Sequence, residues 1–470
     1  MENNFLSKDK RNIKELIKNL SIVLNVDIST LRPIEEKLDK IILKSSLKDM
    51  LEEFFNLLET DMSSLIDKRI TPSFQFGLRN KYFTFIGYYG KYNSHTTSKD
   101  ITHNTYYSFD SISKVLTSIV TMLMIRDGKV TFNSPVTSIN PEFNMDASIE
   151  SILKFTAMIQ TEKRIDNLPI SETIDILKRC KENLQEKALY KNYYQYNDIG
   201  YMILRLSIPD FLDRLDTILN LIDGDNLTYK NTSFKDKITG GRLGLEYFTP
   251  DTKGRGIDFP GHTGLYGNIE GLLNLFYQIF FTNNILTKEE LEILLKVPYN
   301  DPSVYTKDGT RAVSKNGSMQ YMAKTSGIYR TPTNMLEEKI NKMTSCDFSN
   351  LTTNRAMASA GTCGSWVMGD NIAYNALFGT YTGGILTNPY SSIEIGNYPD
   401  SRNMIPGTNL VVNQRGVIFN YSSMLNEYKE IICQYGLILE VLTEYIKNTY
   451  KDYNLDNKQI TYIRKLKPNR

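Results

Sequence analysis

A helical segment that is apolar on nearly every side sets the first constraint on the fold of this chain. Residues 111–127 follow helical spacing, and their large apolar side chains surround the helix axis instead of forming one stripe. A helix of this kind is normally buried inside a large domain. The chain has 470 residues, of which 41% are hydrophobic, so it can form such a core. Gly128 is expected to cap the C-terminus of the helix.

Strand patterns flank a middle region of helical patterns. Aromatic and polar residues alternate on both sides of Arg79-Asn80, which is typical of a β-hairpin. The expected segments are helices at 46–68, within 148–220, at 267–281 and at 424–450, a hairpin at 74–92, and strands between 373 and 422. This order predicts a mixed α/β domain of the α+β type, in which an antiparallel sheet from N- and C-terminal segments carries a helical insert. We expect an N-terminal helical extension at 1–45, this domain at 46–450, and a C-terminal tail at 451–470.

The composition argues against several functions. The chain carries 55 Lys and Arg against 53 Asp and Glu, a net charge of +2, which is not the pattern of a nucleic-acid binder or a polybasic membrane binder. No stretch is long and apolar enough for a membrane span, and the charged N-terminus is unlike a secretion signal, so we expect a soluble, cytoplasmic protein without membrane insertion. The four cysteines are far apart and the three histidines are scattered, so no metal site or disulfide framework is expected.

One serine–lysine pair stands at the start of the apolar helix. The pair belongs to the S-x-x-K motif Ser111-Ile112-Ser113-Lys114. Other S-x-x-K motifs begin at Ser7, Ser45 and Ser151. The motif at Ser111 differs from them because it opens a core helix, where free N–H groups favour negative charge. Lys114 lies one turn later on the same face, and a buried lysine could accept a proton from the hydroxyl. In the alternative interpretation, Ser111 only caps the helix and Lys114 extends to solvent.

Two further motifs carry groups suited to acyl transfer. In Tyr196-Asn197-Asp198, the phenol is suited to moving protons and the carboxylate to orienting a lysine; the alternative is an ordinary aromatic-rich helix start. The other motif is Tyr381-Thr382-Gly383-Gly384, which precedes an apparent strand. Its glycines let a substrate approach the backbone and can offer an N–H to an oxyanion, although a simple turn between strands gives the same pattern.

The order and spacing of these motifs resemble those of the serine β-lactamase-like superfamily, which includes class C β-lactamases, penicillin-binding proteins, D-amino-acid peptidases and related esterases. That superfamily has S-x-x-K, then Y-x-N, then a K/H-T-G strand. Intervening segments are also similar to the superfamily pattern, and the resemblance covers about residues 50–445. The similar segments are 124–130, 152–156, 198–204 and 261–266.

The resemblance implies a serine hydrolase that needs no cofactor. Ser111 would form an acyl-enzyme with an ester or amide, while Lys114 and Tyr196 would move the protons. The backbone N–H groups of Ser111 and Gly384 would hold the oxyanion, with Asp198, Tyr381, Thr382 and Gly383 beside the substrate. The expected partner is therefore a small-molecule or peptide-like ester or amide. The oligomeric state stays open.

Two single residues and one segment depart from the superfamily pattern. The segment is Phe155-Thr156-Ala157, which lacks the usual His-Thr-Ser-Gly form. Tyr381 stands where Lys or His is usual, and a neutral phenol pairs weakly with a carboxylate, so esterase-like substrates are favoured over β-lactams. Asp198 stands where Asn is commoner, and its charge can hold Lys114 protonated. A catalytically impaired binding or regulatory module, with residues 1–45 as a docking element, is therefore the alternative function. His262-Thr263-Gly264 is an alternative H-T-G motif, although His262 is expected to be a buried or pocket-rim residue because a helical pattern follows it.

Overall fold

The computed structural model describes the chain in segments. They are residues 13–19, 21, 27–67, 73–90, 100–108, 112–163, 165, 168–189, 197–222, 225–229, 237–238, 259–262, 264–295, 323–325, 328–330, 356–360, 363–367, 377–382, 410–412, 418–450 and 459–467. All structural statements below concern these residues.

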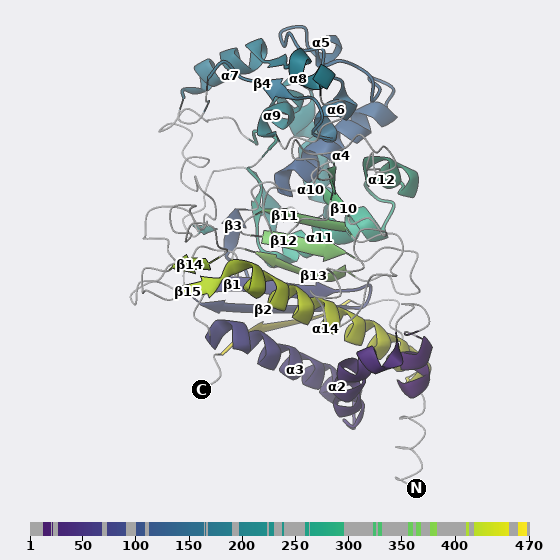
Figure 1. Ribbon diagram of the computed structural model, residues 1–470. Coiled ribbons are helices and arrows are strands. Elements are labelled where there is room, and N and C mark those ends of the chain that lie inside the picture. The colour runs from purple at the N-terminus through teal and green to yellow at the C-terminus, as the bar shows by residue number, and fades with distance from the viewer. Residues whose placement is uncertain are drawn as a thin grey trace.

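An eight-stranded sheet divides the molecule into two helical layers (Figure 1). Its order is β16-β2-β1-β13-β12-β11-β10-β9. The strands are β1 (Ser73–Arg79), β2 (Phe83–Gly90), β9 (Ala323–Thr325), β10 (Ile328–Arg330), β11 (Ala356–Ala360), β12 (Cys363–Val367), β13 (Leu377–Thr382) and β16 (Ile460–Lys465). All neighbours pair antiparallel except β16 and β2, which are parallel.

The hairpin expected around Arg79-Asn80 is present as β1 and β2. Asn80 makes the turn, because its Oδ1 accepts hydrogen bonds from the N–H groups of Tyr82 and Phe83, both at 2.9 Å. Both outer edges of this hairpin pair with strands from much later in the chain. β13 pairs with β1, and β16 pairs with β2. The sequence analysis did not foresee β16, which lies in the segment expected to be a C-terminal tail.

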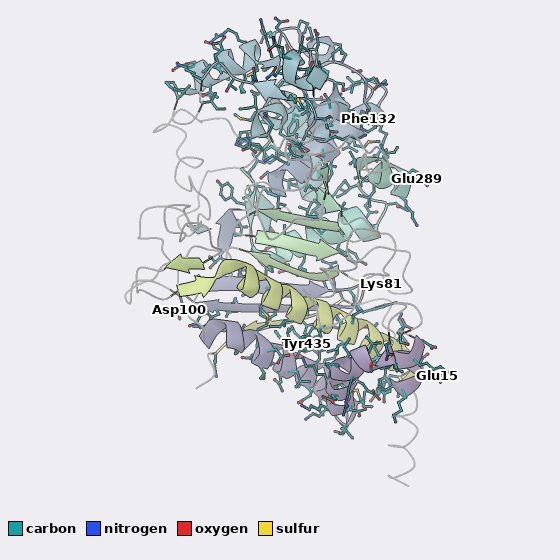
Figure 2. All side chains as sticks on the ribbon, in the orientation of Figure 1. Glu15, Lys81, Asp100, Phe132, Glu289 and Tyr435 are labelled. Carbon is teal, nitrogen blue, oxygen red and sulfur yellow. The ribbon has the colours of Figure 1, made fainter. Side chains whose placement is uncertain are left out.

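One face of the hairpin is covered by helices from both ends of the chain. They are α2 (Arg32–Ile42), which follows the 3-10 helix η1 (Ile28–Leu31), α3 (Leu47–Asp67) and α14 (Tyr421–Thr449). Their apolar side chains form one buried cluster with those of β1 and β2, and it includes Ile13, Ile34 and Leu38 from the N-terminal region. Figure 2 labels Tyr435 on α14, whose hydroxyl donates to Asp61 of α3 at 2.8 Å. The described part of the expected N-terminal extension is therefore packed into the core.

The opposite face is covered by α11 (Ile269–Phe281), above which the remaining helices form a second core (Figure 1). The apolar helix expected at 111–127 is α4 (Ser113–Arg126), which is buried at every position from Ser113 to Met122. Gly128 follows it with φ +69° and serves as the expected C-terminal glycine. None of the described helices is long and apolar enough to cross a membrane.

Shorter elements complete the structure. The helices are α5 (Val136–Ile139), α6 (Ile149–Leu153), α7 (Ile170–Arg179), α8 (Leu184–Leu189), α9 (Asp198–Ser207), α10 (Phe211–Ile222) and α12 (Lys288–Leu295). A four-stranded sheet has the order β6-β8-β3-β7, formed by β3 (Tyr106–Ser108), β6 (Leu227–Thr228), β7 (Lys237–Ile238) and β8 (Tyr266–Gly267). Two small antiparallel sheets pair β4 (Ile159–Gln160) with β5 (Lys181–Glu182), and β14 (Leu410–Val412) with β15 (Ile418–Asn420).

We predict that Phe54→Ala lowers the free energy of unfolding by about 3–5 kcal/mol, because it leaves a cavity in the core between α3, β2 and α14. The Phe54 ring is fully buried, with its centroid 4.6 Å from that of Phe85 and 5.7 Å from that of Tyr435. Urea denaturation measures the change. The control is Leu43→Ala, at a side chain that is 54% exposed, and it should change stability by less than about 0.5 kcal/mol. Equal effects of the two substitutions would contradict the packing described here.

Candidate active site

A fully buried lysine lies in the first turn of α4. The Lys114 side chain has no exposed surface, and its Nζ is 2.6 Å from Oδ1 of Asp198 on α9. The same Nζ donates to the backbone oxygen of His262 at 3.0 Å. The Tyr201 ring also lies near it, with the centroid 5.8 Å away. The ammonium therefore has an anion, a carbonyl dipole and an aromatic ring around it in place of water.

Asp198 is held in place by the start of α9. The preceding residue, Asn197, is the N-cap, and its Oδ1 accepts from the N–H groups of Ile199 at 2.7 Å and Gly200 at 3.4 Å. The Asn197 amide donates in turn to the oxygen of Ile159 at 3.0 Å. The Asp198 side chain is 46% exposed although the lysine it pairs with is not. The contact itself is buried, while the rest of the Asp198 side chain reaches the surface.

The other side of α4 is hydrogen-bonded to residues 259–262 and 264–265, here called the 259–265 segment. Thr117 Oγ1 donates to the oxygen of Gly261 at 2.6 Å, and the N–H of Leu265 donates to Ser113 Oγ at 3.0 Å. Arg205 of α9 donates through Nε to the oxygen of Phe259 at 3.1 Å. The segment therefore joins α4 to α9 and fixes the carbonyl of His262 against the lysine.

The backbone of the 259–265 segment bends sharply to make these contacts. Phe259, Gly261 and Gly264 have φ values of +46°, +90° and +101°. At Gly261 a Cβ would lie 2.6 Å from the oxygen of Tyr201 and 2.6 Å from Cβ of Arg205. Only glycine combines this φ with such close contact.

The structure brings three of the expected site residues together: Lys114, Asp198 and His262. His262 takes part through its carbonyl group, and its side chain is buried at 6% exposure. The residues that follow it form β8 of the four-stranded sheet and then α11, so His262-Thr263-Gly264 does not precede a strand of the eight-stranded sheet.

Other expected residues lie at or beyond the edges of the described segments. Ser111, Tyr196, Gly383 and Gly384 are outside the described residues. Strand β3 ends at Ser108 and α4 begins at Ser113, so the described chain reaches both flanks of Ser111. Tyr381 and Thr382 are the last residues of β13, where they pair with Phe76 and Gln75 of β1.

Four polar residues that support the lysine were missing from the sequence predictions. They are Ser113, Thr117, Asn197 and Arg205. Local rules were enough to find two of them: Asn197 precedes an apolar helix, as an N-cap does, and Thr117 is three residues after Lys114 on the same face. The contact of Arg205 with Phe259 joins residues that are far apart in the sequence, and no local pattern indicates it.

The chemistry available to the described site is proton transfer and charge stabilisation by side chains. A lysine beside a carboxylate can hold or pass on a proton at the N-terminus of a helix, where negative charge is favoured. Among the described residues, no group of three or more His, Cys, Asp and Glu side chains could hold a metal ion.

Comparison with solved structures identifies the fold. No family model matches the sequence, and no curated protein matches it significantly. A β-lactamase/D-alanine carboxypeptidase from Yersinia pestis is similar at a TM-score of 0.50 and 11% identity, covering 80% of this chain and 98% of its own. A class C β-lactamase from Rhodobacter sphaeroides gives 0.49 at 12% identity, covering 82% and 99%. A D-amino acid amidase from Ochrobactrum anthropi gives 0.48 at 13% identity, covering 84% and 99%.

The likeness to the Yersinia pestis structure shows that this chain has the fold of the serine β-lactamase-like superfamily. The resemblance read from the ordered motifs is thus confirmed at the level of the fold. The structures it resembles are those of hydrolytic enzymes.

We predict that Gly261→Ala destabilises the protein more than Gly128→Ala does. Both glycines have positive φ, but a Cβ at Gly128 meets nothing within 4 Å. Gly128→Ala should therefore cost about 1–2 kcal/mol of backbone strain, whereas Gly261→Ala adds a steric clash of about 1–3 kcal/mol. Chemical denaturation of the two variants measures the difference. Equal losses would mean that the 259–265 segment does not pack against α9 as described.

Proposed function

We propose that this protein is a serine hydrolase that acts on an ester or amide through an acyl-Ser111 intermediate. The observation that carries the proposal is the buried Lys114 ammonium, held by Asp198 Oδ1 at 2.6 Å and the oxygen of His262 at 3.0 Å, three residues after Ser111. The β-lactamase-like fold supports the same function, because it is the fold in which the sequence motifs were expected.

The cost of burying the lysine argues for a chemical role. Removing an ammonium group from water costs several kcal/mol, and a well-packed apolar side chain is often as stable or more so in the same place. The neighbours of Lys114 on α4 are apolar at Val115 and Leu116, which are fully packed. A lysine here needs three dedicated partners from two other segments, and stability alone does not account for that arrangement.

In the proposed reaction Ser111 Oγ attacks the acyl carbon and a new C–O bond forms. The hydroxyl proton passes to Lys114 or Tyr196, and the same pair protonates the leaving group as its bond to the acyl carbon breaks. A water molecule then adds to the acyl-enzyme and gives a proton to the pair, and the Ser111 oxygen takes a proton as it leaves. Asp198 orients the Lys114 side chain in both its amine and its ammonium form.

The oxyanion is proposed to bind the backbone N–H groups of Ser111 and Gly384, with Tyr381, Thr382 and Gly383 beside the substrate. Loss of one such donor typically lowers the rate about 10²–10³-fold. Tyr381 is neutral at pH 7, so this wall of the site favours an uncharged ester or amide over a substrate that must be bound by its carboxylate. We further propose that the catalytic domain expected at 46–450 also includes the described N-terminal helical residues, which pack on β1 and β2, and β16, which pairs with β2.

Chemical labelling tests whether Ser111 is the nucleophile. A fluorophosphonate probe should label the wild-type protein at Ser111 and leave Ser111→Ala unlabelled, as measured by intact mass and peptide mass spectrometry. Ser113→Ala is the matched control, because Ser113 is fully buried in the same turn and its Oγ accepts from Leu265. That variant should still be labelled. Equal labelling of the wild type and Ser111→Ala would exclude Ser111 as the nucleophile.

A catalytically impaired binding or regulatory module is the second candidate, and the short Lys114–Asp198 contact favours it. A full negative charge at 2.6 Å stabilises the ammonium form, which cannot accept a proton. The docking role considered for residues 1–45 gains less support, because the apolar face of α2 already packs against α3 and α14. Absence both of probe labelling and of turnover of short-chain esters and D-amino-acid amides would favour the module.

Asp198→Asn tests whether the carboxylate controls the proton on Lys114. The amide oxygen can still accept from Lys114, but the charge is gone, so the lysine releases its proton at lower pH. The rising limb of the Ser111 labelling rate against pH should therefore move to lower pH. Asp210→Asn is the control, because this acid on the distant α10 N-terminus pairs with Arg214 and Lys129 instead. Superimposable pH profiles for wild type and Asp198→Asn would show that Asp198 does not control the proton on Lys114.

A further inference from the structure

A buried glutamine in β1 joins parts of the chain that are far apart in sequence. Gln75 has no exposed surface. Its Nε2 lies 2.9 Å from the oxygen of Thr102, 3.1 Å from that of His103 and 2.9 Å from that of Thr105. Its Oε1 accepts from the N–H of Ile269 at 3.0 Å. Both ends of this amide are therefore bonded to backbone groups of two other segments.

The backbone groups around Gln75 require an amide at this position. Along β1, Phe76 and Leu78 point into the core with α3 and α14, whereas a Cβ at Gly77 would meet Leu273 of α11. Gln75 lies on the same side as Gly77, facing the layer of α11. The two N–H bonds of one amide serve three carbonyl groups that gather around it. No apolar side chain can replace these bonds.

Each segment that Gln75 binds leads to a different part of the proposed site. The turn at 102–105 continues into β3, which ends three residues before Ser111. Ile269 begins α11, directly after β8 and the 259–265 segment that holds Lys114. Gln75 itself is the pairing partner of Thr382, the last residue of β13.

We propose that Gln75 is a positioning residue, which fixes the segment carrying Ser111 and the segment holding Lys114 against the end of β13. This inference rests on the proposed function, because it assigns the reacting groups to these segments. Acyl transfer requires the nucleophile and the oxyanion donors to keep their separation to a fraction of an ångström, and a 1 Å misplacement can cost about 10²-fold in rate. Among the described residues, β3 belongs to a sheet separate from the eight-stranded one. The chain just before β3 is bonded to β1 through the Gln75 amide and to β2 through the N–H of Ile101, which donates to the oxygen of Gly90 at 3.0 Å.

Two substitutions test the positioning role. Gln75→Glu keeps the acceptor for Ile269 and loses the donors to the three carbonyl groups, while Gln75→Met loses both. The control is Asn80→Asp, at a second buried amide next to β1, which keeps its acceptor for Tyr82 and Phe83 and loses its donor to Thr443. Thr443 is on α14, so this control perturbs the opposite layer.

The measurement is fluorophosphonate labelling of Ser111 in the folded full-length variants. The maximal labelling rate at saturating probe should fall about 10- to 100-fold in both Gln75 variants, while the probe concentration for half of that rate changes little. Hydrogen exchange of the backbone amides at 105–108 and at Ile269 should become faster in the same variants. Asn80→Asp should change neither quantity.

The outcomes separate this inference from the proposed function. If the wild type is not labelled at Ser111, the proposed function fails, and hydrogen exchange alone then decides whether Gln75 positions these segments. Wild-type labelling rates in folded Gln75 variants would overturn the inference and leave the hydrolase intact. Unchanged exchange at 105–108 and at Ile269 would overturn it as well. Failure of both Gln75 variants to fold, with Asn80→Asp folded, would also overturn it by making Gln75 a residue of global stability.

Discussion

The buried ammonium of Lys114 is the interaction on which the rest of the site depends. A charge without contact to water requires an opposite charge and further acceptors close by. Here these partners come from two separate segments, the start of α9 and the bend before β8. Neither segment can move away without leaving a bare charge inside the protein. The lysine therefore couples α4, α9 and the 259–265 segment into one unit.

The eight-stranded sheet relates this unit to the rest of the molecule. One face packs on helices from both chain ends, and the other supports α11 and the layer that contains α4 (Figure 1). The end of β13 and the start of α4 are the described elements next to the proposed site residues in the sequence. Gln75 binds the turn before β3 and the start of α11 with a single side chain. The Gln75 side chain can thus hold the two hydrophobic cores, one on each face of the sheet, in a fixed position relative to each other next to the proposed site.

Patterns of a few neighbouring residues in the sequence predicted the features that depend on local interactions. Burial of α4, the turn at Asn80 and the glycine after α4 all follow from local periodicity or local backbone needs. The position of Lys114 one turn into a core helix was also predictable. The pairing of Lys114 with Asp198 was expected from the motifs, and the structure has it at 2.6 Å. The contact of Lys114 with the backbone oxygen of His262 was not expected, because it arises only through tertiary packing. The same holds for Gln75, since nothing in an aromatic-rich strand indicates that its amide will meet the turn before β3.

Strand β16 has a consequence for how the protein is made. The hairpin of β1 and β2 leaves the ribosome early, but its partners are β13, about 300 residues later, and β16, at 460–465. Until those residues are synthesised, both edges of the hairpin present unpaired N–H and C=O groups. Pairing across such distances in sequence is slow and leaves nascent chains open to aggregation. Both edges of the hairpin can therefore be paired only after β13 and β16 have been synthesised.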